Sequence, residues 1–269
     1  MTAMCEFFGI SRAAYYAWRK RCEQPDRDGP RLQLIEEAYL ASRKTYGYRR
    51  IKLWIEQTKG VVINHKAVLR LMNKLSLRTV ARKRKPYHRR LSKESTHQYA
   101  NILNRDFTAS EPNQKWVTDI TYIRTKRGWA YLSTIKDVYD GFIVAHHLSR
   151  QMSVALVTKT LKKAKQKEMV TDGTLLHSDQ GLQYTSRGYF RLTKQYNITP
   201  SMSRRGNCWD NAPMENFFGH LKEEALRQFP VLSFTETEQL IDEYIYFYNH
   251  ERIQLKTKQT PYQLRCLSS

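Results

Sequence analysis

Three acidic side chains in this sequence occupy places where a carboxylate is more useful for chemistry than for solubility. Asp119 lies inside an alternating, β-branched run and has apolar neighbours. Asp179 follows a short apolar run that ends in a polar, glycine-containing turn. Glu215 belongs to a segment with apolar residues at helical spacing. An isolated acid in any of these places is more often a cap or a surface charge. Three of them together predict a site that holds two divalent ions, Mg²⁺ or Mn²⁺, for phosphoryl transfer.

The segments around these acids predict the elements that must position them. Hydrophobic periodicity and turn residues indicate strands at 115–124, 129–137, 142–148, 174–177 and 198–201, and helices at 153–167, 186–196 and 212–227. Pro213 suits the first turn of the last helix, where its missing N–H is harmless. This order is that of an α/β, ribonuclease-H-like fold with a mixed five-stranded sheet, and it brings Asp119 beside Asp179.

Other polar residues in the same region compete for the catalytic role. Asp140 precedes Gly141 in a turn, where an aspartate is ordinary, and we assign it no catalytic function. Asp137 ends a strand and has the chemistry to bind a metal. His177 lies two residues before Asp179. In a constellation of acids we expect this histidine to be a supporting hydrogen-bond donor or a core residue rather than a ligand.

The sequence motifs around the three acids resemble those of a known protein family. Thirty-five residues separate Asp179 from Glu215, which matches the D,D(35)E signature of the retroviral-integrase-like superfamily. The segments WVTDITYI, LLHSDQGLQYTS, SMSRRGNCWDNAPMENFFGHLKEE and YNHERIQLKTKQTP are similar to the second-frame, or OrfB-type, transposases of bacterial insertion sequences. The N-terminal segments CEFFGISRAAYYAWRKR and YGYRRI are also similar to that family, so the resemblance covers nearly the whole chain.

The resemblance implies an integrase catalytic core that cleaves DNA and transfers strands during transposition. It implies a homo-multimer on paired DNA ends and an upstream-frame product that acts as a partner or a fusion. The resemblance also implies that Asp137 is not a catalytic acid, because the family residue that corresponds to Asp137 is not one of the three catalytic acids. Two alternatives remain open: a structure-selective nuclease of ribonuclease-H type, and a DNA-binding regulator without catalysis. No Gly-rich phosphate loop is present, so we predict no dependence on ATP.

Composition agrees with a nucleic-acid partner. The 269 residues include 46 Lys plus Arg against 25 Asp plus Glu, a net charge of +21. Such an excess indicates a polyanion, most commonly nucleic acid, although ribosomal or nonspecific basic proteins share it. The four cysteines are far apart and form no zinc-finger pair. With no long apolar run and no signal pattern, we expect a soluble, unexported protein. The resemblance implies that it is a bacterial, cytoplasmic and nucleoid-associated protein.

The N-terminal third predicts a separate helical region. We divide the chain into a helical, helix-turn-helix-like region at 1–92 that ends in a basic arm, a linker at 93–111, and the catalytic core with a C-terminal helix at 112–269. Ser11 and Asn64 are suited to cap helices in the first region. The helical pattern also fits any small bundle, so contact with DNA is an expectation that the resemblance supports.

Basic and aromatic residues are candidates for DNA contact. Lys222 shares a helical face with Glu215, and we expect it to position the end of the DNA near the metals. Trp209 has the ring to stack on an unpaired base, but it suits a core equally. The basic arm is expected to follow a phosphate backbone, unless it only solubilises a linker. The remaining predicted phosphate contacts are Arg82, Lys83, Arg84, Lys85, Arg204, Arg205 and Arg252.

Overall fold

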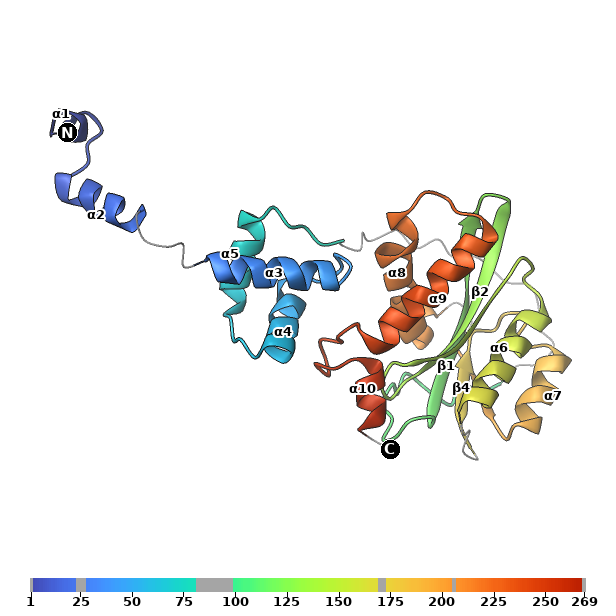
Figure 1. The fold of residues 1–269 in the computed structure, drawn as a ribbon. Coiled ribbons are helices and arrows are strands. Elements are labelled where there is room, and N and C mark those ends of the chain that lie inside the picture. Colours follow the sequence, from blue (N-terminus) through green and yellow to red (C-terminus); the bar gives the residue numbers. More distant parts are fainter. Residues whose placement is uncertain (1, 23–27, 81–98, 169–172, 205–206, 268–269) are drawn as a thin grey trace. The chain divides into compact units, whose positions relative to one another are not determined.

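The chain forms two compact units, Met1–Thr79 and Val80–Ser269. The computed structural model describes residues 2–22, 28–80, 99–168, 173–204 and 207–267. Each unit has its own packed elements (Figure 1). No helix within these described ranges is both long enough and apolar enough to cross a membrane.

The first unit is helical, as predicted. Helices α1 (Thr2–Phe7) and α2 (Arg12–Cys22) contact each other, and α3 (Gly29–Ala41), α4 (Tyr48–Lys59) and α5 (His65–Lys74) pack together. The Ser11 hydroxyl accepts a hydrogen bond from Ala14 N at 3.1 Å, and the Asn64 side chain accepts one from Lys66 N at 2.8 Å. Both predicted helix caps are therefore confirmed. The buried residues of α3, α4 and α5 include Ile35, Ile51, Ile55, Val68 and Leu71.

The second unit is built on a five-stranded mixed sheet, which confirms the predicted fold class. Its strands are β1 (Lys115–Thr125), β2 (Gly128–Asp137), β3 (Ile143–Ser149), β4 (Leu175–Ser178) and β5 (Thr199–Met202). The order across the sheet is β3-β2-β1-β4-β5. Strands β1, β2 and β3 form an antiparallel meander, whereas β4 pairs in parallel with both β1 and β5. Strand β1 is therefore central and lies beside β4.

Helices cover both sides of this sheet. In Figure 1, α6 (Val154–Lys167) and α7 (Arg187–Gln195) lie on one side, and α8 (Ala212–Glu224) and α9 (Phe234–His250) lie on the other. A short α10 (Pro261–Cys266) contacts α9. The first side encloses an apolar core that includes Trp116, Ile135, Val144, Val157, Leu161, Leu176 and Tyr189. Burial of such side chains is the main source of stability for the unit.

The helix that carries Glu215 is shorter than its sequence pattern predicts. Pro213 lies in its first turn as expected, but the helix ends at Glu224, and a separate 3₁₀ turn, η2, follows at Leu226–Gln228. Ala225 leaves helical geometry at the junction, with φ −120° and ψ −69°. The chain then reaches Ser233, which opens α9 with a Ser233–Glu236 capping box. A short loop thus separates η2 from α9.

Candidate active site

Asp119 lies in the middle of the central strand. Its neighbours Thr118 and Thr121 are buried, and Asp119 itself is half-buried. The Asp119 Oδ1 atom accepts a hydrogen bond from Ile120 N at 2.7 Å, which fixes one oxygen of the carboxylate. Asp119 pairs with Thr134 of β2, and the pairing of β1 with β4 ends two residues earlier, at Val117.

Asp179 is the first residue after β4, at the carboxyl end of that strand. Strands β4 and β1 run in parallel, and Val117 is opposite His177. Asp119 and Asp179 each follow these paired residues by two positions, so they lie toward the same end of the two strands. The Asp179 Oδ1 atom accepts a hydrogen bond from Gly181 N at 2.9 Å. A Cβ atom on Gly181 would lie only 2.9 Å from that oxygen. The turn therefore needs glycine so that the carboxylate can fold back onto the backbone.

Glu215 is exposed in the first turn of α8. The start of this helix is tied to the central strand, because Asn211 Nδ2 donates a buried hydrogen bond to Thr118 O at 3.0 Å. Thr118 directly precedes Asp119 in β1. The structure thus fastens the helix of one predicted acid to the strand of another.

Electrostatic effects link Asp119 to the other two predicted acids. The pKa of Asp119 is raised well above its ordinary value by burial and by the charges of Asp179 and Glu215. The hydrogen bond from Ile120 N and the charge of Lys222 act in the opposite direction. Burial also raises the pKa of Asp179, while the hydrogen bond from Gly181 N lowers it. Asp179 and Glu215, which come from distant parts of the chain, therefore both disfavour ionisation of Asp119.

The donor set fits a hard divalent cation. All three side chains are carboxylates, Mg²⁺ prefers oxygen ligands, and a cation would relieve their mutual repulsion. Asp179 and Glu215 have solvent-exposed surface, so an ion has access. Among the described residues, however, no three His, Cys, Asp or Glu side chains form a ready-made metal site. The metal-binding role of the acids therefore stays a prediction.

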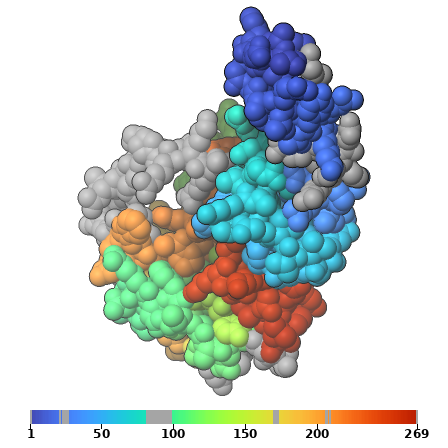
Figure 2. All heavy atoms as spheres, turned by 90° about the vertical axis from the view of Figure 1, so that its left-hand side faces the viewer, coloured from blue at the N-terminus to red at the C-terminus, as the bar shows by residue number. Residues whose placement is uncertain are grey.

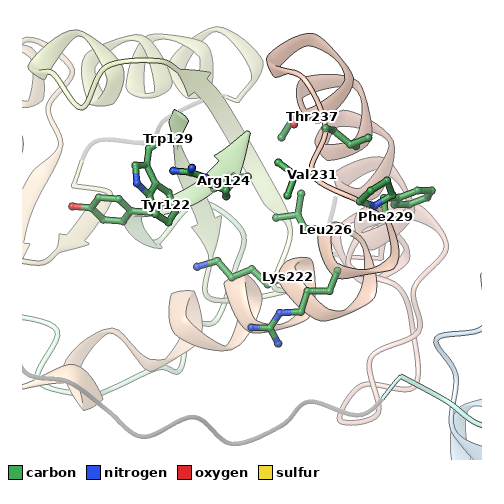
Figure 3. A pocket seen from close by; sticks show the side chains of 12 residues that line it. Tyr122, Arg124, Trp129, Lys222, Leu226, Phe229, Val231 and Thr237 are labelled. Atoms are coloured by element: carbon green, nitrogen blue, oxygen red, sulfur yellow. The ribbon is translucent and has the colours of Figure 1, made fainter. Parts of the chain in front are cut away.

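Lys222 extends this site toward a neighbouring cavity. It is half-buried in the last turn of α8, two turns from Glu215, and its charge lowers the pKa of Asp119. Figure 3 shows its side chain beside Tyr122 of β1. The Lys222 side chain also lines a cavity of about 690 Å³. Its predicted contact with DNA remains a prediction.

Comparison with known proteins adds sequence relationships to this geometry. Residues 109–208 and 215–268 match integrase core domains, and residues 26–85 match an HTH-like domain. The chain is 39% identical over 253 residues to an uncharacterised 31 kDa protein of insertion element IS600 from Shigella sonnei, covering 93% of this chain and 92% of the relative. It is 38% identical to the putative transposase InsK of insertion sequence IS150 from Escherichia coli K12, covering 95% and 90%. The chain belongs to the OrfB-type insertion-sequence transposases.

The fold of the transposase agrees with this assignment. A simian T-cell lymphotropic virus intasome, solved in complex with a PP2A regulatory subunit, aligns with a TM-score of 0.52 at 17% identity. The alignment covers 85% of this chain and 73% of that one. The predicted family, enzyme class and integrase-like core are confirmed.

A buried acid that sequence analysis overlooked organises the loop before α8. The transposase buries Asp210 completely. Its carboxylate accepts hydrogen bonds from Arg204 Nε and Nη2, both at 3.0 Å, from Arg105 Nε at 2.7 Å and from Asn101 Nδ2 at 3.0 Å. These contacts hold the pKa of Asp210 far below its usual range, against the effect of burial. In Figure 2 the green surface of the segment after residue 98 adjoins orange surface of the same unit, in accord with these bonds.

The predicted DNA contacts have different outcomes in the transposase. The prediction for Arg252 is wrong, because its side chain is fully buried and donates to Glu224. Arg204 is half-exposed while it binds Asp210, and its contact with phosphate stays a prediction. Trp209 is 70% exposed, which rules out the core role considered for it and leaves base stacking as a prediction. Arg82, Lys83, Arg84, Lys85 and Arg205 lie outside the described residues.

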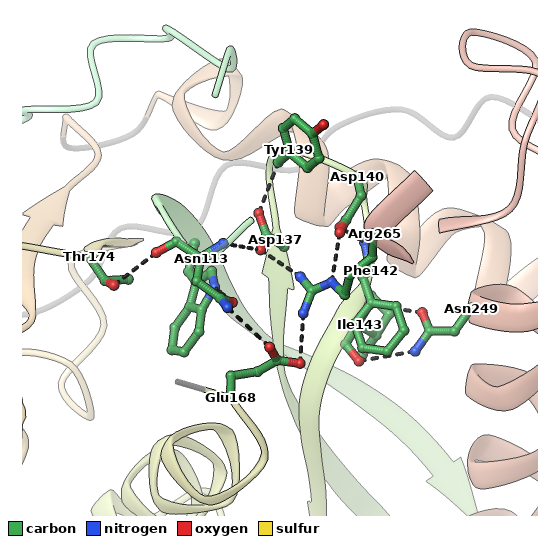
Figure 4. A network of polar contacts seen from close by, with 11 residues as sticks. Asn113, Asp137, Tyr139, Asp140, Phe142, Ile143, Glu168, Thr174, Asn249 and Arg265 are labelled. Atoms are coloured by element: carbon green, nitrogen blue, oxygen red, sulfur yellow. Dashed lines mark hydrogen bonds and ion pairs between the residues drawn. The ribbon is translucent and has the colours of Figure 1, made fainter. Parts of the chain in front are cut away.

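Asp137 and Asp140, the two other aspartates considered for catalysis, belong to an ion-pair cluster at the C-terminal end of β2. Arg265 of α10 contacts Asp137 at 2.6 Å, Asp140 at 2.7 Å and Glu168 at 2.6 Å (Figure 4). The pKa of Asp137 is raised to about 6 by burial and by Asp140, against the effects of Asn113 N and Arg265. Since both aspartates are engaged with this arginine, the cluster serves the packing of the C-terminal helix.

His177 is a core residue. This is one of the two roles predicted for it, the other being a supporting hydrogen-bond donor. It is fully buried, and its Nδ1 lies 2.9 Å from the Ser201 hydroxyl. Burial lowers the pKa of His177 to about 4, so the imidazole is neutral near pH 7. The Ser201 oxygen also accepts hydrogen bonds from Ile102 N and Leu103 N. The histidine therefore supports the linkage of the segment after residue 98 to β4 and β5.

Proposed function

We propose that Asp119, Asp179 and Glu215 hold two divalent ions, Mg²⁺ or Mn²⁺, with which this transposase cleaves the ends of its element and joins them to target DNA. The placement of the acids supports the proposal: Asp179 follows the strand that pairs with the strand of Asp119, and a hydrogen bond from Asn211 to Thr118 ties the helix of Glu215 to that strand. The charges of Asp179 and Glu215 add to the effect of burial in raising the pKa of Asp119. Asp137 and Asp140, by contrast, are engaged with Arg265. Acids that repel one another at an accessible site are suited to a cation.

The residues of the chain have distinct tasks in this mechanism. Asp119 gives a fixed position in the sheet, and Asp179 and Glu215 approach it from a turn and a helix. When bound, the ions activate a water or a DNA 3′-hydroxyl for in-line attack on a phosphodiester and stabilise the leaving oxygen. Lys222 orients a phosphate of the DNA beside the acids. Hydrolysis and strand transfer then differ only in the nucleophile.

DNA binding draws on the whole chain. The net charge of +21 supports strong, salt-dependent attraction to the phosphate backbone. The helical first unit reads or grips the element ends, and the basic run with Arg82, Lys83, Arg84 and Lys85 follows the backbone. We further propose a homo-multimer on paired ends, with an upstream-frame product as partner or fusion, that acts on DNA in the bacterial cytoplasm and nucleoid.

A strand-transfer assay tests the proposal. Purified protein, with and without the upstream-frame product, is incubated with labelled element-end DNA and Mg²⁺ or Mn²⁺. We expect joined products from the unaltered protein and from Glu243→Gln, an exposed acid of α9, but none from Glu215→Gln. Metal-dependent cutting without joining, even with the partner present, supports a nuclease instead. Tight binding with neither activity supports a regulator.

A further inference from the structure

A cavity of about 690 Å³ is lined in part by Lys222, which lies two helical turns from Glu215 (Figure 3). One wall is the end of the β1–β2 hairpin, and the other is formed by η2 and the loop that leads to α9. The hairpin tip is joined to that loop by a hydrogen bond from Lys126 N to Leu232 O at 2.8 Å. The volume of the cavity lies within the range of roughly 300–1,000 Å³ that is usual for small-molecule sites.

Exposed aromatic rings form the hairpin wall. Trp129 is 52% exposed and Tyr122 is 42% exposed. Their ring centroids are 6.3 Å apart in an edge-to-face arrangement, and Tyr131 lies 5.2 Å from Tyr122. Arg124 pairs with Trp129 across the hairpin, and its guanidinium lies 5.5 Å from the centre of the indole ring. The hairpin thus holds large apolar rings at a surface that water reaches.

The charged residues in the described lining of the cavity are all basic: Arg124, Lys222 and Arg227. Arg227 also pairs with Glu223 of α8. Lys222 belongs both to this lining and to the electrostatic surroundings of Asp119. An anion bound in the cavity would therefore lie next to the acids that are proposed to hold the metals.

We infer that this cavity binds an unpaired nucleotide of the DNA whose strand is at the active site. The base stacks on the Trp129 ring, with the Tyr122 ring against its edge, and its phosphate contacts Lys222 and Arg124. Rings and cations together suit a nucleotide, since every base has a π-face and every linkage carries a negative charge. A fully paired duplex would use the cations but not the rings. The inference rests on the proposed function only in taking DNA as the substrate.

Binding of unpaired DNA tests the inference without any reaction. Short duplexes of one sequence, either blunt or with a 3′ or a 5′ overhang that contains 2-aminopurine, are titrated with the full chain in EDTA. We expect tighter binding of one overhang duplex than of the blunt duplex, with quenching of 2-aminopurine as the base stacks. Trp129→Ala should weaken overhang binding about 5- to 150-fold, the range that stacking of one base supplies.

Matched variants separate the outcomes. Trp129→Phe should retain most of the preference, and Tyr246→Ala, which removes a 59% exposed ring outside the cavity, should leave it unchanged. Equal affinity for blunt and overhang DNA, or an unchanged preference in Trp129→Ala, would overturn the inference. Glu215→Gln should keep the preference while it loses strand transfer. Loss of strand transfer in that variant, with no overhang preference in any protein, would reject the cavity and retain the proposed function.

Discussion

Arg252 donates two hydrogen bonds to Glu224, from Nε at 2.7 Å and from Nη2 at 2.6 Å. The arginine is fully buried, and the Glu224 side chain is only 6% exposed. The pair joins the C-terminal end of α8, which carries Glu215, to the segment after α9. Arg252, which the sequence suggested for DNA contact, instead holds the C-terminal end of α8, the helix that carries Glu215.

Removal of this arginine should destabilise the protein. In Arg252→Ala, Glu224 would remain buried without its main cation, a change that typically costs about 3–5 kcal/mol. Denaturant unfolding measures the loss. Arg187→Ala, at an exposed position of α7, should change the free energy of unfolding by less than about 0.5 kcal/mol. A small loss in Arg252→Ala would show that the pair contributes little to folding.

The same pair predicts sensitivity to acid. Burial alone would raise the pKa of Glu224, but hydrogen bonds from His220 and Arg252 outweigh it and lower the pKa to about 2. A lowered folded-state pKa stabilises the protein above the ordinary value of 4.5, and this contribution is lost as pH falls from about 4.5 toward 2. The difference in Tm between the unaltered protein and Glu224→Gln should therefore shrink between pH 6 and pH 3. A constant difference would contradict the prediction.

Replacement of Asp119 should abolish strand transfer and raise the free energy of unfolding. Because burial and two neighbouring acids raise its pKa, the ionised carboxylate is costly in the folded protein. We expect Asp119→Asn to raise the free energy of unfolding in EDTA by about 0.5–2 kcal/mol, with strand transfer abolished. Added Mg²⁺ should raise the Tm of the unaltered protein but not that of the variant. A lower Tm for Asp119→Asn in EDTA would refute the prediction.

Gly181 sets the position of Asp179. The Cβ of Gly181→Ala would approach Asp179 Oδ1 at 2.9 Å, so the carboxylate must move away from its turn. We expect strand transfer to fall about 10- to 100-fold, since small displacements of a reacting group are costly. Gly188→Ala, whose Cβ would meet Val154 Cγ1 at 3.4 Å, is the control and should retain activity. Full activity in Gly181→Ala would show that the carboxylate tolerates the shift.

Local patterns in the sequence predicted most of the core. The alternating run around Asp119 became β1, and the apolar pair before His177 became β4. The Ser11 and Asn64 caps are present as expected. These features depend on residues that are close in the chain, where spacing and residue type are informative.

Long-range charge pairing was the part that sequence did not predict. Nothing local distinguishes Arg252, which is buried on Glu224, from an arginine that faces DNA. Asp210 is bound by nearby Arg204, but its other partners, Arg105 and Asn101, lie about one hundred residues earlier, and nothing local pointed to them. The partners of a buried charge are set by topology, and only the assembled sheet brings those segments together.

The cluster around Arg265 also bears on how the protein is made. Arg265 follows Glu168 by 97 residues in the chain, and Asp137 and Asp140 come earlier still. During synthesis the three acids therefore emerge well before the one cation that contacts them all. Until the ribosome has added α10, the nascent core must carry these carboxylates in water or protonated. This part of the transposase fold is thus completed only after α10 has been made.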